Sequence, residues 1–365
     1  MKLNWANKLF FVVNIIVAIA LLFASSSSLV DPSQSSLIYL FGLTYPVLLI
    51  LNILFLLHWL YRLKIHLLLS LIVILMGFSN LQSLFAFSTQ KETPKQAEFS
   101  IMTFNVRLLN RYNWFEEDNI DQQIFDYIDE KQPDIVAFQE FINVAKSKLF
   151  YIKKMKALGY PYFKRESKPK TGNFFGLITF SKFKISESGP AFQYQTTTGK
   201  TISLYTDIKI FDQTIRVYNT HLNSLGFITD DYLFVENIGK QTEKEALQKS
   251  KSILSKVMVA ARKREIEVEA IIDHVATSPF PVIVVGDFNE PPYSFSYPKF
   301  TNTLVDPFIK HEFGFGTTFD GISTIPGLRL DFILHSEDLK TVSFQTGPAG
   351  LSDHRPIMSW FDLTK

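Results

Sequence analysis

Three long windows without a charged side chain occupy the first 88 residues of this chain, at 9–30, 32–61 and 67–88. A helix needs about 20 apolar residues to cross the hydrocarbon core of a bilayer, and each window is long enough. A helix hairpin buried in a soluble protein would instead keep a polar face toward water. We therefore expect residues 1–88 to form a membrane anchor with three transmembrane helices, at about 9–30, 37–60 and 67–88.

Two alternatives remain open for parts of this anchor. Lys2 and Lys8 precede the first window and small residues follow it at 24–26, which is also the pattern of a cleaved signal peptide. Polar residues at 79–83 interrupt the third window, so a tilted or interfacial helix fits that segment as well. Cleavage of the first window would still leave two spans.

The basic residues around the windows predict the orientation of the anchor. Lys2 and Lys8 precede the first window, and Arg62 and Lys64 separate the second from the third, whereas the loop between the first two carries only Asp31. Short cytoplasmic loops collect Lys and Arg. We expect an integral membrane protein with a cytoplasmic N-terminus and with its larger, C-terminal part on the extracytoplasmic side.

The larger part follows a short polar linker at 89–100 and spans 101–365. After residue 88 the chain carries 33 basic and 34 acidic side chains, against 37 and 35 in the whole sequence, so the formal net charge of this part is −1. General charge attraction to nucleic acid is therefore not built into it. The absence of Cys excludes disulfides, thiol nucleophiles and cysteine metal sites.

Short apolar runs separated by polar turns predict a β-rich domain over 101–365. The runs are rich in Val, Ile, Phe and Tyr, as strands are, and lie at 101–106, 135–138, 175–180, 202–210, 214–220, 281–285, 330–334 and 357–360. Helical patterns cover about 118–131, 143–158 and 241–275. The last is basic, which indicates either a solvated face or contact with anionic headgroups or another polyanion. This mixture is typical of a single sandwich-type α+β domain.

Polar clusters cap five of the apolar runs, and a sixth places a carboxylate inside a run. They are TFNV at 103–106, FQE at 138–140, YNTHL at 218–222, GDFNE at 286–290, SDHRP at 352–356 and RLDF at 329–332. Each cluster alone is weak evidence, because Asn or Asp after a strand usually marks a turn. The whole set is chemically coherent, because carboxylate and amide oxygens suit a hard divalent cation and histidines transfer protons near neutral pH.

Two histidines, together with a carboxylate that lies inside a predicted strand, point to acid/base chemistry. His221 and His354 are the available proton-transfer groups. Asp331 is a candidate to fix the tautomer of His354 and to raise its basicity. A metal together with such a pair fits attack of water on a phosphate ester, where charge builds on the non-bridging and leaving oxygens.

These clusters resemble those of the endonuclease/exonuclease/phosphatase superfamily of magnesium-dependent phosphodiesterases and phosphatases. The resemblance covers about 99–362, and its most specific parts are 286–289 and 352–356. It implies a four-layer α/β/β/α sandwich of two packed, mostly antiparallel sheets. It also implies a metal site, in which Asn105, Glu140 and Asp353 would hold Mg²⁺, with Mn²⁺ as a substitute.

The same resemblance implies the catalytic residues. Asp287 and Asn289 would position the attacking water and the scissile phosphate. Asp331 and His354 would form an acid/base or phosphate-polarising dyad. His221 would match the second histidine of the deoxyribonuclease and sphingomyelinase branches.

Further residues are weaker candidates. In the deoxyribonuclease branch the second histidine leans on a Glu, and Glu166 is the positional candidate for that partner. Four aromatic residues near the expected mouth either stack on a base or lipid or simply pack; they are Tyr112, Trp114, Tyr293 and Phe295.

We therefore expect a membrane-tethered enzyme that hydrolyses a phosphodiester, with a nucleic acid or a phospholipid or sphingolipid headgroup as substrate. Its other partner is the lipid bilayer, contacted through residues 1–88, and no obligate protein partner is evident. A catalytically silent binding module is the alternative, although every expected position is filled. A transporter is less favoured, because no window contains a carboxylate, a Lys or an Arg.

Overall fold

Helices form the N-terminal part of the chain. In apolar surroundings the backbone N–H and C=O groups find no outside partner, so they pair with each other within a helix. The computed structural model describes residues 4–89, 97–114, 117–144, 150–166, 173–195, 200–227, 229–236, 243–322 and 328–364. The first helix is capped by Asn4, whose side chain accepts a hydrogen bond from the backbone N–H of Asn7 at 2.9 Å. The helices of this part are α1 (Trp5–Ser26), α2 (Ser36–Gly42), α3 (Tyr45–Tyr61), α4 (Leu67–Met76) and α5 (Phe78–Leu84).

One predicted span is unbroken, and the other two are bent. Among the described residues, Trp5–Leu29 is long and apolar enough to cross a membrane. The second and third windows are each split into two helices, with a bend of 59° between α2 and α3 and of 69° between α4 and α5. Three continuous transmembrane helices were therefore a wrong prediction. Pro46 explains the first break, because it opens α3 without an N–H to donate to the preceding turn.

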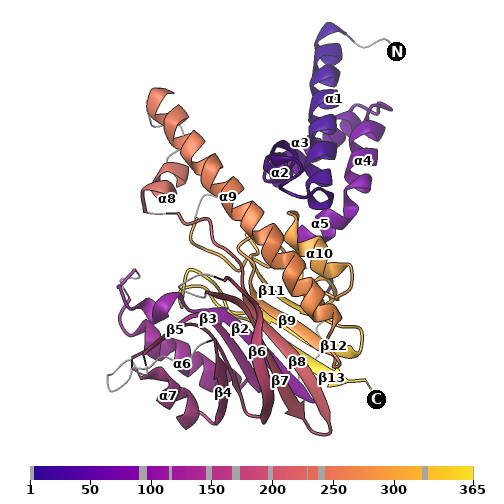
Figure 1. The fold of residues 1–365 in the computed structure, drawn as a ribbon. Coiled ribbons are helices and arrows are strands. Elements are labelled where there is room, and N and C mark those ends of the chain that lie inside the picture. The colour runs from indigo at the N-terminus through magenta and orange to yellow at the C-terminus, as the bar shows by residue number, and fades with distance from the viewer. Residues whose placement is uncertain are drawn as a thin grey trace.

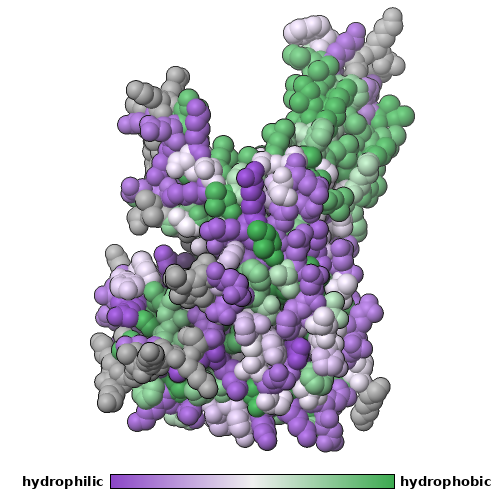
Figure 2. Space-filling view, in the orientation of Figure 1, coloured by the Kyte–Doolittle hydropathy of each residue, from purple (hydrophilic) through white to green (hydrophobic). Residues whose placement is uncertain are grey.

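The anchor buries polar groups between its helices and turns apolar groups outward. Asn14 donates to the Ser70 hydroxyl at 2.8 Å and accepts from the indole N–H of Trp59 at 3.0 Å, and all three residues are buried. Ile16 and Val47, by contrast, are each 61 % exposed. Figure 2 shows the resulting hydrophobic surface on these helices. Such a distribution suits helices surrounded by lipid.

Two sheets form the larger part of the molecule (Figure 1). The six-stranded sheet has the order β12-β13-β2-β3-β5-β4 and comprises β2 (Phe99–Asn105), β3 (Ile135–Asn143), β4 (Tyr162–Arg165), β5 (Phe174–Ser181), β12 (Leu339–Thr346) and β13 (Ile357–Leu363). The five-stranded sheet has the order β11-β9-β8-β7-β6 and comprises β6 (Ile185–Gln193), β7 (Thr201–Ile210), β8 (Gln213–His221), β9 (Val282–Asp287) and β11 (Asp331–His335). Within these two sheets, β2 pairs with β3 and β8 with β9 in parallel, and the other pairs are antiparallel.

Three apolar clusters mark the interfaces between four layers. Alternate strand residues face opposite ways, so Ile101 and Ile135 pack between the sheets, whereas Met102 and Val136 pack outward against α6 (Ile120–Lys131) and α7 (Tyr151–Ala157). The outer face of the five-stranded sheet is covered by α9 (Glu243–Ala276) and α10 (Ser296–Thr301). The predicted sandwich of packed sheets is therefore confirmed.

The anchor also packs directly on the sandwich. Just before the predicted linker, β1 (Ala86–Phe87) pairs with β10 (Phe313–Gly314). Residues 90–96 of that linker lie outside the described residues, and β2 already begins at Phe99. Among the described residues, the remaining helices are α8 (Thr229–Glu236), α11 (Pro307–His311) and two short 3-10 helices, at Ser27–Leu29 and Arg107–Asn110.

A buried polar lock joins α2 to the sandwich. Tyr39 of α2 donates its hydroxyl hydrogen to Glu290 at 2.6 Å and accepts from the guanidinium of Arg264 in α9 at 3.0 Å. All three residues are buried. The anchor is therefore held against the sandwich by specific contacts, and Figure 1 shows it on the same side of the sandwich as the free end of α9.

Candidate active site

His221, Asp287 and Asp331 lie in one row across three neighbouring strands. His221 is paired with Asp287 at the ends of the parallel strands β8 and β9, and Asp331 of β11 lies opposite Asp287 on its other side. Neighbouring strands lie about 4.8 Å apart, so this register alone brings the three side chains together.

Gly286 allows β9 to place Asp287 in this row. Its φ is +138°, and a Cβ at this position would collide with the backbone carbonyl of Thr220 on β8. Only glycine tolerates both the conformation and the close approach. The glycine of the GDFN motif therefore has a structural role next to the site.

Asn105 connects the second sheet to this row. It ends β2, and its amide N–H donates to the Asp287 carboxylate at 2.9 Å. Its side-chain oxygen accepts from the backbone N–H of Arg107 at 3.1 Å, which fixes the orientation of the amide. Asn289 donates its backbone N–H to the other oxygen of Asp287 at 2.8 Å. The Asp287 carboxylate is therefore fixed by donors from both sheets.

Glu140 reaches the same place through an irregularity in β3. The register between β3 and β5 shifts between Phe138 and Phe141, and Glu140 has a left-handed φ of 49°. A bulge redirects a side chain that would otherwise follow the alternation of the strand. The Glu140 carboxylate lies 3.8 Å from Nε2 of His221.

His354 and Asp331 form a buried pair. Nδ1 of His354 lies 2.8 Å from the Asp331 carboxylate, and its Nε2 lies 3.6 Å from Asp287. Burial favours the neutral ring, but the negative charges of Asp331 and Asp287 outweigh it and raise the pKa of His354 to about 10. The surroundings of His354 therefore favour its charged form.

The surroundings of His221 have the opposite effect. Burial, supported by the positive charge of Lys200, lowers its pKa to about 4. Its Nε2 is buried without a hydrogen-bond partner and faces Asp287 at 3.6 Å and Glu140 at 3.8 Å. Glu166, which the sequence offered as the partner of His221, packs against Gly176 of β5. The two histidines of the site therefore have pKa values shifted in opposite directions.

One cavity of about 440 Å³ collects most of the predicted residues. Six of them line it: Asn105, Glu140, Asp287, Asn289, Asp353 and His354. Asp331 supports His354 through Nδ1, and His221 stands beside Glu140 and Asp287. All eight predicted residues thus belong to one contact network or its cavity wall.

The sequence model of the Endonuclease/Exonuclease/phosphatase family matches residues 102–354. This chain belongs to that family. A second model, described as a domain of unknown function (DUF8431), matches residues 7–84. No curated protein matches the chain.

Solved structures with similar folds come from several organisms. A family protein from Leptotrichia buccalis C-1013-b is 17% identical, with a TM-score of 0.47, and the match covers 73% of this chain and 100% of that one. The family member from Bacteroides vulgatus is 17% identical, with a TM-score of 0.48, covering 73% and 98%. The catalytic domain of human Nocturnin, solved with a bound sulfate anion, is 19% identical, with a TM-score of 0.45, covering 76% and 100%.

Several residues that line the cavity of the present chain were not singled out from the sequence, and two of them, Arg107 and Leu43, bear on the site. Arg107 forms an ion pair with Asp353 at 2.9 Å, and its guanidinium lies over the ring of Trp114 at 4.8 Å. Its position two residues after Asn105 was the available signal. Leu43, at the bend between α2 and α3, also lines the cavity. No sequence signal pointed to Leu43, because it precedes the predicted linker and is far along the chain from the other residues of the cavity.

The acidic groups of the site fit a divalent cation. Burial and the neighbouring negative charge of Asp353 raise the pKa of Glu140, which a cation between the two carboxylates would reverse. A second buried group, Asp287, Asp331 and His354, has ligand atoms within 4.8 Å of one another. There the Nδ1 of His354 is already bonded to Asp331. The oxygen-rich set around Glu140 therefore suits a hard cation better.

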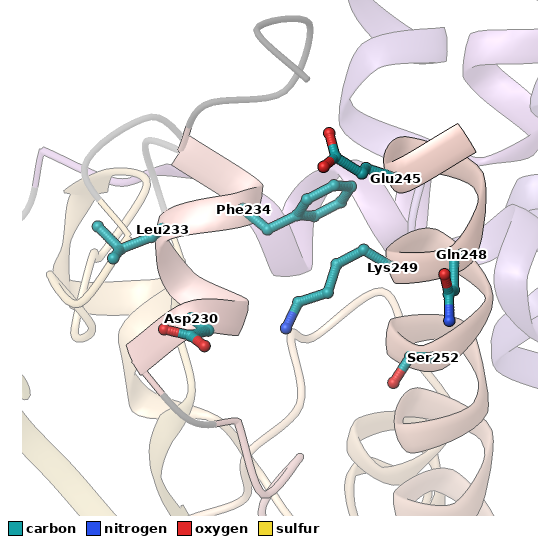
Figure 3. Close-up of a pocket in the computed structure, with 7 residues that line it drawn as sticks. All are labelled: Asp230, Leu233, Phe234, Glu245, Gln248, Lys249 and Ser252. Atoms are coloured by element: carbon teal, nitrogen blue, oxygen red, sulfur yellow. The ribbon is translucent and has the colours of Figure 1, made fainter. Parts of the chain in front are cut away.

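A larger cavity of about 740 Å³ lies away from this chemistry, between α8 and α9. Figure 3 shows Lys249 extending from α9 toward α8, with Asp230 and Phe234 on the facing helix. Lys249 and Lys256 bind Asp231 of α8 at 3.0 and 2.5 Å. Part of the basic surface predicted for this helix is therefore used to hold α8. None of the predicted site residues lines this cavity.

The four aromatic residues that the sequence offered near the mouth of the site lie in different places. Tyr293 lines the catalytic cavity, whereas Phe295 is buried in the core beneath α9. Tyr112 and Trp114 are exposed and contact each other edge to face, with ring centroids 5.2 Å apart.

Proposed function

We propose that this chain is a membrane-tethered, metal-dependent phosphodiesterase. The observation that supports this most is the convergence of the buried His354–Asp331 pair with the carboxylates of Glu140 and Asp287. Family membership favours hydrolysis of phosphoric esters. A silent binding module would have no need for a histidine held charged beside a carboxylate cluster.

Asn105, Glu140 and Asp353 would hold the metal, for which we propose Mg²⁺, with Mn²⁺ as a substitute. When bound, such an ion offsets the charge of the phosphate and lowers the pKa of water. Arg107 keeps one oxygen of Asp353 occupied at 2.9 Å and thereby orients the other.

Asp287 and Asn289 would orient the attacking water and the phosphate. The Asp287 carboxylate is held in place by Asn105 and by the backbone of Asn289, so its remaining lone pairs have a fixed direction. His354 would direct its proton toward a phosphate oxygen, where negative charge builds. His221, which is neutral, would act as an acceptor beside Glu140.

We further propose that residues 1–88 anchor the enzyme and that 101–365 form the catalytic domain. The unbroken helix Trp5–Leu29 supports one crossing, and the two bent pairs would add two more if each pair spans the bilayer. The distribution of basic residues favours a cytoplasmic N-terminus and an extracytoplasmic catalytic domain. Protease added to intact cells should then cleave exposed loops of the sandwich, and cleavage only after the inner face is opened would reverse this topology.

The activity is tested with the full chain in detergent and bis-p-nitrophenyl phosphate as substrate. We expect hydrolysis with Mg²⁺, none with chelator, and a loss on the order of 10²-fold or more in Glu140→Gln and His354→Gln. Glu130→Gln is the matched control, because Glu130 lies on α6 with a 67% exposed side chain.

A metal-binding readout keeps the metal site separate from catalysis. Mg²⁺ should raise the Tm of the wild type, because it binds only the folded chain. The same ion should not raise the Tm of Glu140→Gln. An inert but folded wild type that still gains Tm from Mg²⁺ would instead support the silent binding module.

A further inference from the structure

Two chemically different sets of side chains line the cavity of the proposed active site. One set consists of the charged and amide groups of that site. The other set is apolar and comprises Leu43, Leu225, Phe227, Ile322, Leu328 and Leu330. A phosphodiester bound to the first set would therefore share its cavity with a hydrophobic lining.

The anchor itself supplies part of this apolar wall. Leu43 belongs to the bend between α2 and α3, within the second apolar window of the chain. Leu225 and Phe227 belong to the loop after β8, and they pack against Tyr39 and its neighbours in α2. The cavity wall and the anchor thus form one continuous apolar surface.

The same segment of the anchor also presents apolar side chains outward. Tyr39 and Leu40 of α2 lie in the same apolar cluster as the loop residues, and the Tyr39 hydroxyl is held by Glu290 and Arg264. On the helix that follows Leu43, Val47 is 61% exposed. The segment that contributes Leu43 to the cavity therefore also carries side chains that suit lipid.

Features that would favour a nucleic acid are weak here. Arg107 is the single Lys or Arg among the described residues that line the cavity, and it is paired with Asp353. The aromatic rings are occupied as well. Phe319 packs against the ring of His354 at 4.9 Å, and Tyr293 stacks on Tyr45 of the anchor at 5.6 Å. Base stacking needs a free ring face.

We propose that the substrate is a membrane lipid whose headgroup contains a phosphodiester, and that the α2–α3 bend is part of its binding site. This inference rests on the proposed function. The phosphodiester lies against the charged and amide groups, and an acyl or sphingoid chain lies against the apolar lining that includes Leu43. Water forms a new P–O bond, one ester P–O bond breaks, and the leaving oxygen takes a proton, which yields a phosphomonoester and an alcohol. Glycerophospholipids and sphingolipids share this chemistry.

The test compares two substrates across matched variants of the full chain in detergent. The substrates are bis-p-nitrophenyl phosphate, which has no apolar chain, and mixed micelles containing either phosphatidylcholine or sphingomyelin. We expect Leu43→Gln to lower kcat/KM for the lipid about tenfold more than for the small diester, as loss of one apolar contact to the chain predicts. Leu328→Gln, on the sandwich side of the wall, should act in the same direction.

Leu75→Gln is the matched control, because it makes the same change at a 58% exposed position of α4 outside the cavity lining. It should leave both rates near those of the wild type. Equal loss for both substrates in Leu43→Gln would overturn the inference. Cleavage of plasmid DNA with no cleavage of either lipid would overturn it too, while leaving the proposed phosphodiesterase intact.

Lipid binding is also measured without catalysis. A photoactivatable phosphatidylcholine analogue should crosslink to peptides that contain Leu43 or residues 225–227, and excess unlabelled lipid should compete. Crosslinking confined to the outer faces of α1 and α3 would overturn the inference. If bis-p-nitrophenyl phosphate is not hydrolysed at all, the proposed function fails, and the crosslinking result still decides whether the cavity binds lipid.

Discussion

Asn105 and Asp287 are hydrogen-bonded across the interface between the two sheets, with 2.9 Å between the amide nitrogen and the carboxylate oxygen. Both residues are buried, and each ends a strand of a different sheet. The bond therefore fixes the relative position of the two halves of the site. It also satisfies a carboxylate that burial would otherwise destabilise.

Asn105→Ala should weaken both stability and activity. It leaves the buried Asp287 carboxylate without one donor, which costs about 1–3 kcal/mol in the free energy of unfolding. Activity should fall further than stability alone explains, because Asn105 is also a proposed metal ligand. Chemical denaturation and bis-p-nitrophenyl phosphate hydrolysis measure the two effects. Asn302→Ala, at an exposed position, is the control, and an active, equally stable Asn105→Ala would contradict the assignment.

Asp331→Asn should remove the negative charge that lies 2.8 Å from Nδ1 of His354 and helps to raise its pKa. We expect kcat to fall on the order of 10²–10⁴-fold with little change in KM, because substrate does not contact Asp331 directly. Asp338→Asn, at an exposed position after β11, is the comparison. A large rise in KM with kcat unchanged would assign Asp331 to substrate binding instead.

Glu166→Gln should alter stability in a pH-dependent way. Burial raises the pKa of the Glu166 carboxyl from 4.5 to about 7. Below pH 4.5 the group is neutral in folded and unfolded chains, so it costs nothing there. Between pH 4.5 and 7 the unfolded chain ionises first, so the folded state loses stability as the pH rises, by about 1–3 kcal/mol in total. The variant should therefore raise Tm relative to wild type at pH 8.

At pH 4 the same Glu166→Gln variant should have nearly the wild-type Tm, because the native carboxyl is then also neutral. Thermal unfolding of both proteins at the two pH values measures this difference. An equal gain in Tm at both values would show that the effect does not come from ionisation of Glu166.

Tyr39→Phe should loosen the contact between anchor and sandwich. Its hydroxyl hydrogen-bonds both Glu290 and Arg264, and these two buried charges would lose a shared partner. We expect a loss of about 1–3 kcal/mol and faster proteolysis between the two parts. Tyr61→Phe removes a hydroxyl from an 86% exposed ring and serves as the control. Identical proteolysis of both variants would show that the lock is unnecessary.

The sequence predicted the inner strands well, because they are apolar on both faces. Each of the eight predicted runs is a strand, and β3 and β13 extend beyond the predicted limits. The strands that were missed lie at sheet edges. β6 contains Gly189 and Pro190 and is half-exposed along its length, and β12 alternates buried with polar positions. Edge strands carry less apolar signal, so composition alone does not separate them from turns.

The helices were predicted less evenly. The predicted helix at 143–158 is shorter in the described residues, where α7 covers Tyr151–Ala157, and residues 145–149 lie outside them. The membrane windows were recognised from hydropathy, which cannot report the bends at Leu43 and Gly77. Hydropathy measures composition, whereas a bend depends on a local backbone change.

The site was predicted through motifs, and its geometry came from features that motifs do not encode. The bulge that redirects Glu140 depends on pairing between β3 and β5. The protonation of His354 depends on two carboxylates from other strands. Such effects arise from residues far apart in the chain, so they become visible only when the strands are placed together.

The position of Leu43 in the same cavity as Glu140 and His354 limits how this protein can be rebuilt by recombination. An unrelated helix fused to residues 101–365 would leave the cavity without Leu43 and would leave Glu290 and Arg264 without Tyr39. We therefore expect exchanges that keep the two segments matching separate family models together to be tolerated better than exchanges that separate them.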